Sequence, residues 1–175
     1  MPQRGLTLLE LLITLVILSL LLSIGLPSFQ RQIDQSRAHT ATQSLMSALQ
    51  ATRHRAIARN GRATLRAQGG WENGWELFDD LNHNGVRDEG EPIILSHALD
   101  GRSVLIEGNQ PVSSYVSYVG SGQSRHASGT PRGGFQGGTI TICTSDGAEG
   151  YKLVLARMGR VRREPIGADS CTSSG

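Results

Sequence analysis

An uninterrupted apolar run near the N-terminus constrains this 175-residue chain more than any other feature. From Leu11 to Leu26 the residues are aliphatic, apart from small Ser, Thr and Gly residues that a helix tolerates. With Thr7 to Glu10 before it and Pro27 to Phe29 after it, the segment reaches the roughly 20 residues that a helix needs to cross a bilayer. The sequence therefore predicts one membrane-spanning helix ahead of a single modest domain.

A secretory signal peptide is the competing interpretation of this run, because it also contains an apolar segment. Cleavage of a signal peptide needs a small-residue site after the apolar residues. Here Pro27, Phe29 and a helical pattern follow instead. We therefore expect the segment to stay attached to the domain.

The carboxylate of Glu10 is anomalous in such a segment. A charged side chain deep in a bilayer costs several kcal/mol unless a partner or water satisfies it, so an intramembrane acid is functional by default. The alternative is that Glu10 lies at the headgroup level near the end of the helix.

The N-terminus resembles the class III signal of type IV pilins and type II secretion pseudopilins. The resemblance is carried by Arg4 and Gly5, then Leu6 and "TLLELL" with Glu10 fifth after the glycine, and Pro27 at the end of the span. It implies that a prepilin peptidase cuts between Gly5 and Leu6 and that the new amino terminus is methylated. It also implies that Glu10 pairs with the free amine of a neighbouring subunit during filament assembly. Leu6 stands where the family usually has phenylalanine.

The helical pattern continues beyond Pro27. Apolar or small residues recur at spacings of three and four and form one narrow stripe, made of Ile33, Ala38, Ala41, Leu45, Ala48, Leu49, Thr52 and Ala56. Asn60-Gly61 predicts the end of the helix. The expected parts are a leader at residues 1–5, a membrane and filament-core half of the helix at 6–29, an amphipathic half at 30–60 and a periplasmic β domain at 61–175.

The remaining sequence has the character of β-strands. Seven short segments bounded by turn residues predict strands: "ATLRA", "WELF", "PIILSHAL", "SVLIEG", "YVSYV", "TITIC" and "YKLVLAR". Gly120 to Gly138 is too glycine-rich for regular structure and is predicted to be a mobile loop. The expected fold class is α+β, with a long N-terminal hydrophobic helix packed against a C-terminal antiparallel β-sheet domain.

Cys143 and Cys171 are the only cysteines. A domain that faces the periplasm would oxidise them, so we expect a disulfide that ties the C-terminal tail to the "TITIC" strand. A two-cysteine metal site would need further ligands, and none stands nearby in the sequence. The whole arrangement, including "GWELFDDLNHNGVRDEGEPIIL" and the "GR" and "VR" pairs after the last long strand, resembles the GspH/FimT group of minor pilins and pseudopilins, closest in character to FimT.

The segment "DLNHNGVRDEGE" matches the calcium-loop pattern. Its candidate ligands are Asp80, Asn82, Asn84, the Val86 carbonyl, Asp88 and Glu91, with Gly85 at the tight turn. Predicted strands flank the segment in place of helices. The alternative is therefore a polar hairpin loop in which Asp and Asn side chains cap their own backbone turns. Apart from calcium at this loop, no cofactor is expected.

The segment "LARMGRVRREP" concentrates positive charge near the C-terminus. On a strand, Arg160 and Arg162 share one face, and Arg163 is expected to join them from a looser tail. These arginines either guard an edge strand against aggregation or bind phosphate. In the FimT branch the tail motif G-R-x-R contacts DNA, and Gly159, Arg160, Val161 and Arg162 match it. Arg157, Arg163 and Lys152 are added as candidate DNA-binding residues from their charge alone.

The favoured function is that of a type IV minor pilin in the inner membrane and the pilus that binds double-stranded DNA non-specifically during natural transformation. The alternative is a structural minor pilin or type II secretion pseudopilin that primes filament assembly and binds only other pilins. A third reading is a membrane-anchored, calcium-dependent adhesin. The histidines are scattered and no catalytic constellation is recognisable, so we expect no enzyme.

Overall fold

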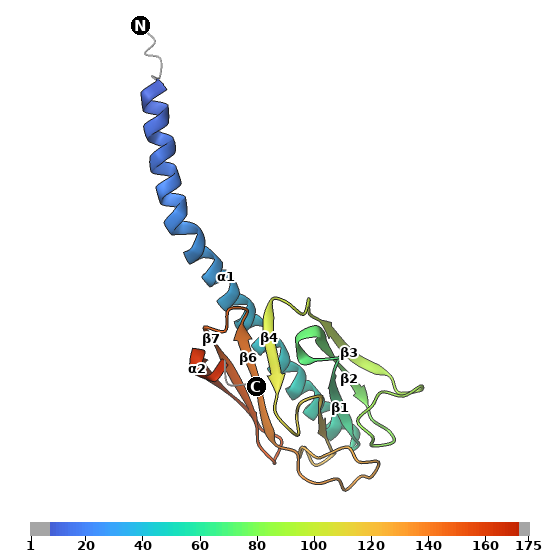
Figure 1. The fold of residues 1–175 in the computed structure, drawn as a ribbon. Helices are drawn as coiled ribbons and strands as arrows, with labels where there is room; N and C mark the ends of the chain where they lie inside the picture. Colours follow the sequence, from blue (N-terminus) through green and yellow to red (C-terminus); the bar gives the residue numbers. More distant parts are fainter. Residues whose placement is uncertain (1–7, 172–175) are drawn as a thin grey trace.

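The computed structural model describes residues 8–171 of the chain, except for the side chains of residues 24–28. Its first element, α1 (Leu8–Arg59), is one uninterrupted helix. The first half of α1 projects from the domain, and the second half lies along the strands (Figure 1). Large aliphatic side chains are exposed along the projecting half, from Leu8 to Leu22.

Hydropathy identifies no membrane-spanning helix within the part of the chain that the structure describes.

The end of α1 is fixed by a local cap. Asn60 adopts a left-handed conformation with φ of 46°, and the Gly61 amide donates to the Ala56 carbonyl at 3.1 Å. Such a residue directly after the last helical turn satisfies carbonyl groups that the helix itself leaves free. The predicted stop at Asn60-Gly61 is therefore confirmed.

The described strands form two four-stranded antiparallel sheets. The first has the order β3-β2-β1-β5, and the second has the order β4-β6-β7-β8. The strands of the first sheet are β1 (Ala63–Ala67), β2 (Gly74–Asp79), β3 (Ile93–Ala98) and β5 (Tyr115–Tyr118). Those of the second are β4 (Val104–Gly108), β6 (Gly138–Thr144), β7 (Glu149–Leu155) and β8 (Val161–Gly167). A short helical turn, η1 (Trp71–Asn73), precedes β2, and α2 (Ala168–Cys171) follows β8.

The core lies between α1 and the two sheets. Seven of the eight residues in the predicted apolar stripe are buried, and only Ile33 is partly exposed. Leu45 and Leu49 are fully covered and pack with Leu65 of β1 and Ile142 of β6 in one hydrophobic cluster. The helix therefore provides one surface that both sheets share. The α+β fold class, with a long helix against an antiparallel β domain, is confirmed.

One detail of the expected β domain needs correction. All seven predicted strands are present, but an eighth strand, β8, follows them. The eight strands form the two sheets given above. The predicted disulfide is present, because Cys143 of β6 and Cys171 of α2 are bonded, with their Cα atoms 5.9 Å apart. This bond holds α2 against the second sheet.

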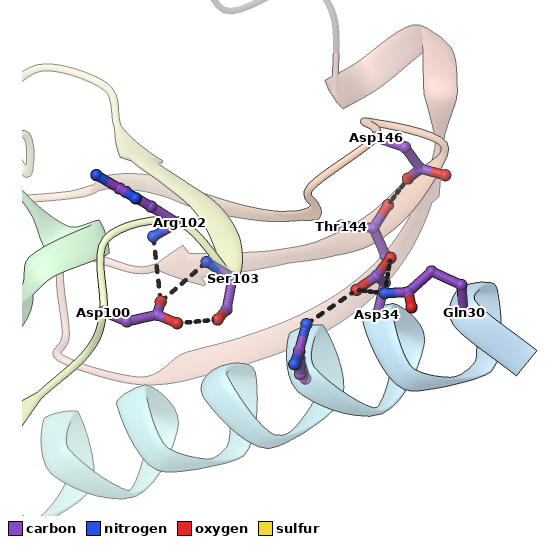
Figure 2. A network of polar contacts seen from close by, with 8 residues as sticks. Gln30, Asp34, Asp100, Arg102, Ser103, Thr144 and Asp146 are labelled. Carbon is purple, nitrogen blue, oxygen red and sulfur yellow. Dashed lines mark hydrogen bonds and ion pairs between the residues drawn. The ribbon is translucent and has the colours of Figure 1, made fainter.

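Local polar contacts lie near the place where α1 meets the domain (Figure 2). On the helix, the Gln30 amide donates to Asp34 at 3.4 Å, and Thr144 of β6 donates to Asp146 at 2.6 Å. In the β3–β4 connection, Asp100 accepts bonds from the Ser103 hydroxyl and from two backbone amides. These bonds, led by that of the Ser103 hydroxyl, lower the pKa of Asp100 to about 2. Asp100 is therefore a fixed negative charge at the end of β3.

An ion pair joins the other end of α1 to β2. Arg55 donates Nε and one terminal nitrogen to the two carboxylate oxygens of Asp79 at 2.9 and 2.8 Å, and Arg59 approaches the same carboxylate at 3.6 Å. The hydrogen bonds from Arg55 lower the pKa of the buried Asp79. The contact locks the last turns of the helix onto the first sheet.

We predict that Asp79→Asn destabilises the domain by about 1–3 kcal/mol at neutral pH, because a neutral amide loses the charge-assisted bonds and leaves Arg55 poorly paired. The folded-state pKa of Asp79 is lowered, so its contribution is present above the ordinary aspartate pKa of about 3.9 and is lost as the pH falls. Urea unfolding at neutral and acidic pH should show the two proteins converging in acid. An equal difference in the free energy of unfolding at both pH values would contradict this account. The control is Asp169→Asn in the exposed α2, which should have little effect at either pH.

Candidate functional site

The β7–β8 turn presents the arginine-rich segment. The Gly159 amide donates to the Ala156 carbonyl at 2.8 Å, and the Ala156 amide donates to the Arg160 carbonyl at 2.9 Å. Gly159 has φ of 79°, and a Cβ added there would lie 2.1 Å from the Gly122 carbonyl oxygen. Glycine is therefore required at this position by the turn itself and by its close packing on residue 122.

Three of the predicted basic residues lie on one face of the β7–β8 hairpin. Lys152 is paired in register with Glu164, and Val154 is paired with Arg162. Because side chains alternate along a strand, Arg160 points to the same side as Arg162. This face is turned away from the core, since the intervening Leu153 and Leu155 are buried.

Only part of this positive charge is available to a ligand. Arg162 Nε lies 2.9 Å from Glu164 Oε1, and the two side chains are 61% and 45% exposed. Arg157 and Arg160 are also exposed. Neither takes part in any ion pair found among residues 8–171. The turn therefore carries two uncompensated cations, whereas Arg162 is partly neutralised by Glu164.

Arg163 does not join this group. It is paired in register with the buried Leu153, and its guanidinium lies 5.2 Å from the centre of the Tyr151 ring. The Tyr151 hydroxyl in turn lies 3.3 Å from Nδ1 of His39 on α1. The expected position in a loose tail is wrong, because Arg163 belongs to β8 and faces the helix side of the sheet.

The glycine-rich segment supports the turn from behind. Arg53 of α1 donates to the Gly122 carbonyl at 2.9 Å and to the Met158 carbonyl at 3.4 Å. The Ser124 hydroxyl lies 3.2 and 3.3 Å from the carbonyls of Ala156 and Arg157. The segment has only two isolated bridges as regular structure, yet hydrogen bonds tie it to the helix and to the turn. No sequence pattern indicated this role of Arg53.

A buried arginine holds the same glycine-rich segment at a second place. Arg62 is 4% exposed, and it donates to the Ser117 hydroxyl at 2.8 Å and to the carbonyls of Arg125 and Thr130 at 3.1 and 3.3 Å. Burial lowers its pKa, and the charge of Asp80 opposes that effect. Arg62 is therefore a structural cation and is not available to a ligand on the surface.

The acidic loop, residues 80–91, is held together by hydrogen bonds to its own carboxylates. Asp80 is fully buried and accepts bonds from the amides of Asn84 and Gly85, both at 3.0 Å. Glu91 accepts bonds from the amides of Leu81 and Asp88, at 2.7 and 3.0 Å. These contacts match the polar-hairpin interpretation of the segment.

The side-chain amides of Asn82 and Asn84 each donate to the Asp88 carboxylate at 2.7 Å. These bonds, of which that from Asn82 has the larger effect, lower the pKa of Asp88. In the described part of the chain, no group of three or more His, Cys, Asp or Glu residues is placed to hold a metal ion. Calcium binding, with the Val86 carbonyl as a further ligand, stays a prediction.

The N-terminal candidates lie at the far end of α1. Gly5 and Leu6, the predicted cleavage and methylation site, fall outside the described residues. Glu10 lies in the first turn of the helix, on its exposed projecting half. Its pairing with the amino terminus of a neighbouring subunit stays a prediction.

Comparison with known proteins places the chain among pilin-like proteins. Residues 41–159 match the family described as type II transport protein GspH, and residues 1–26 match the prokaryotic N-terminal methylation motif. The chain is 30% identical over 167 residues to the pilin-like protein PilA1 of Thermus thermophilus, which covers 94% of this chain and 100% of that protein.

Crystal structures of the type IV minor pilin FimU of Pseudomonas aeruginosa share the fold. One has a TM-score of 0.55 at 19% identity and covers 76% of this chain and 92% of that chain. A second crystal form has a TM-score of 0.52 at 22% identity, over 73% and 92% of the two chains. The chain therefore belongs to the GspH family and is a type IV minor pilin or pseudopilin.

Proposed function

We propose that this protein is a minor pilin of a type IV pilus that binds double-stranded DNA non-specifically through the β7–β8 turn during DNA uptake in natural transformation. The observation that supports the proposal is the pair of exposed, uncompensated arginines, Arg157 and Arg160, on a turn whose backbone is fixed. A guanidinium presents several donors in a rigid fork that fits phosphate oxygens. Contacts of this kind position a protein on DNA without reading its sequence.

The supports of the turn favour such a contact. Gly159 packs on residue 122, and Arg53 holds the carbonyls of Gly122 and Met158 from the helix. The backbone that carries Arg157 and Arg160 is therefore fixed before any phosphate arrives, which lowers the entropy lost on binding. Lys152 and Arg162 lie on the same outer face and extend it along the hairpin.

The proposal includes the usual life cycle of a pilin. A prepilin peptidase cuts between Gly5 and Leu6, the amino terminus is methylated, and the first half of α1 lies in the inner membrane until the subunit joins a filament with other pilins. Glu10 pairs with the amine of a neighbouring subunit at that step. Support comes from the methylation motif at residues 1–26 and from the exposed aliphatic residues along the projecting half of the helix. The subunit has a structural and binding role and catalyses no reaction.

One observation favours the second candidate function, a structural pilin or type II secretion pseudopilin that primes assembly without binding DNA. Arg162 forms an ion pair with Glu164. β8, which carries both residues, is an edge strand of the second sheet. Alternating charges on an edge strand discourage aggregation without any ligand. The two functions differ in whether the arginines of the turn produce salt-dependent binding to DNA.

We predict that Arg157→Gln combined with Arg160→Gln weakens binding to a DNA duplex roughly tenfold at low salt, because two phosphate contacts and their counterion release are lost. The slope of log K against log salt should become less steep by about 0.9 for each lost contact. The measurement is fluorescence anisotropy with full-length protein in detergent and a labelled duplex at several salt concentrations.

The matched control removes the same charge elsewhere, with Arg31→Gln and Arg102→Gln at exposed sites on α1 and the β3–β4 connection. This control should bind DNA almost as well as the parent. Equal loss in both double variants would indicate attraction by net charge alone, and absence of binding by the parent would favour the structural pilin.

We predict that Glu164→Gln strengthens binding to the same duplex about two- to fivefold. The substitution frees Arg162 from its exposed ion pair and removes a negative charge that repels phosphate, an effect on the scale of about 0.2–1 kcal/mol. The gain should be smaller when Glu164→Gln is made in an Arg162→Gln background, because only the repulsion of phosphate by Glu164 is then removed. Unchanged or weaker binding by the single variant would place the phosphate away from the outer face of β8.

A further inference from the structure

The two sheets have four outer strands, and three of them are protected. An open outer strand exposes unpaired backbone groups to which another chain can add, so proteins cover or charge such edges. β8 carries Arg162, Arg163 and Glu164, and Pro165 removes one backbone donor. β5 is covered by the glycine-rich segment, in which the Arg125 amide donates to the Ser117 carbonyl at 3.0 Å.

β4 is the third protected edge, because η1 packs against it and because Glu107 is exposed on it. β3 has neither a covering segment among the residues that the structure describes nor a charged residue of its own, and its one irregularity is a bulge at Ile94 opposite Leu77 and Phe78. It is hydrogen-bonded to β2 alone among the described strands, and Ile93–Ala98 contains neither proline nor a Lys, Arg, Asp or Glu residue.

The open edge of β3 is also apolar on both faces. Ile93, Ile94 and Leu95 are 48%, 41% and 37% exposed. Leu95 is paired with Leu77 and Ile93 with the next residue, Phe78, across a bulge that contains Ile94, so Leu95 and Ile93 lie on opposite faces of the sheet. A strand added to this edge would therefore bury aliphatic surface on both sides as well as pair its backbone.

The charge around β3 limits what can pair with it. From Glu72 to Asp100 the chain has eight acids and a single arginine, Arg87, and that arginine is paired with Glu76 at 3.5 Å. Glu89 before the strand and Asp100 after it are both exposed. The edge therefore combines an apolar centre with an acid near each end, and at the Asp100 end the basic residues Arg37 and Arg102 lie close by.

We propose that β3 is the docking edge for a neighbouring pilin subunit of another kind, which adds an extended strand that carries aliphatic side chains and a basic residue near its end. Proteins of this family assemble with other pilins, so the partner class follows from the family match. The basic residue follows from charge complementarity with Glu89 and Asp100. The inference does not depend on DNA binding.

A second copy of this chain fits the edge poorly. In an antiparallel pair of β3 strands, the Glu89 end of one copy would face the Asp100 end of the other. In a parallel pair, each acidic end would face its own counterpart. Either arrangement places like charges close together, which destabilises strand pairing. The acidic ends thus select a partner with opposite charge.

The test is photo-crosslinking in cells that assemble the filament. A photoreactive phenylalanine is placed at residue 94 of the full chain, and in a matched strain at residue 105, which is also exposed on an outer strand, β4. Crosslinked partners and their attachment points are identified by mass spectrometry. We expect the product at residue 94 to join a strand of a different pilin subunit and to exceed that at residue 105 about tenfold.

A product that joins residue 94 to a second copy of this chain, or to no pilin subunit at all, overturns the proposal. Equal yields from residues 94 and 105 do so as well. A second experiment uses Ile94→Glu, with Leu105→Glu as its control and the partner identified by crosslinking as the purified probe. The change at residue 94 should weaken that binding about tenfold or more, as for a residue at the centre of an interface. Equal effects of the two variants would contradict the assignment.

Discussion

The packing of the second half of α1 against both sheets is the contact on which the rest of the structure depends. Leu45 and Leu49 are fully covered, and alanines around them let the strands approach the helix closely. Both sheets contribute apolar side chains to one cluster with the helix, so α1 covers the inner face of each sheet. The turn, the acidic loop and the open edge of β3 are all placed by that one surface.

The sequence predicts this helix well because its signals are local. A stripe with helical period and the Asn60-Gly61 stop fix its inner face and its end. The strands are also predicted, but their pairing depends on contacts between distant segments, such as β1 with β5, which no local pattern reveals. β8 escapes prediction because arginines and Pro165 hide its alternation.

The candidate site is less predictable than the fold, since its geometry depends on partners far apart in the chain. Gly159 is recognisable from the tail motif, but its packing on residue 122 is visible only in the structure. Arg53 contacts the turn across 105 positions. Glu164 is the exception, because it stands two residues after Arg162 on one strand, and alternation alone places the two side chains together.

A continuous series of buried hydrogen bonds connects the acidic loop to the glycine-rich segment. Asp80 accepts a bond from the Thr64 hydroxyl at 2.8 Å, Thr64 lies 3.0 Å from the Ser117 hydroxyl, and Ser117 accepts a bond from Arg62 at 2.8 Å. Buried charges without such partners would be strongly destabilising. Arg62 then holds the segment that supports the arginine turn. Because these hydrogen bonds are connected, a rearrangement of the acidic loop would break bonds that position the arginine-rich β7–β8 turn.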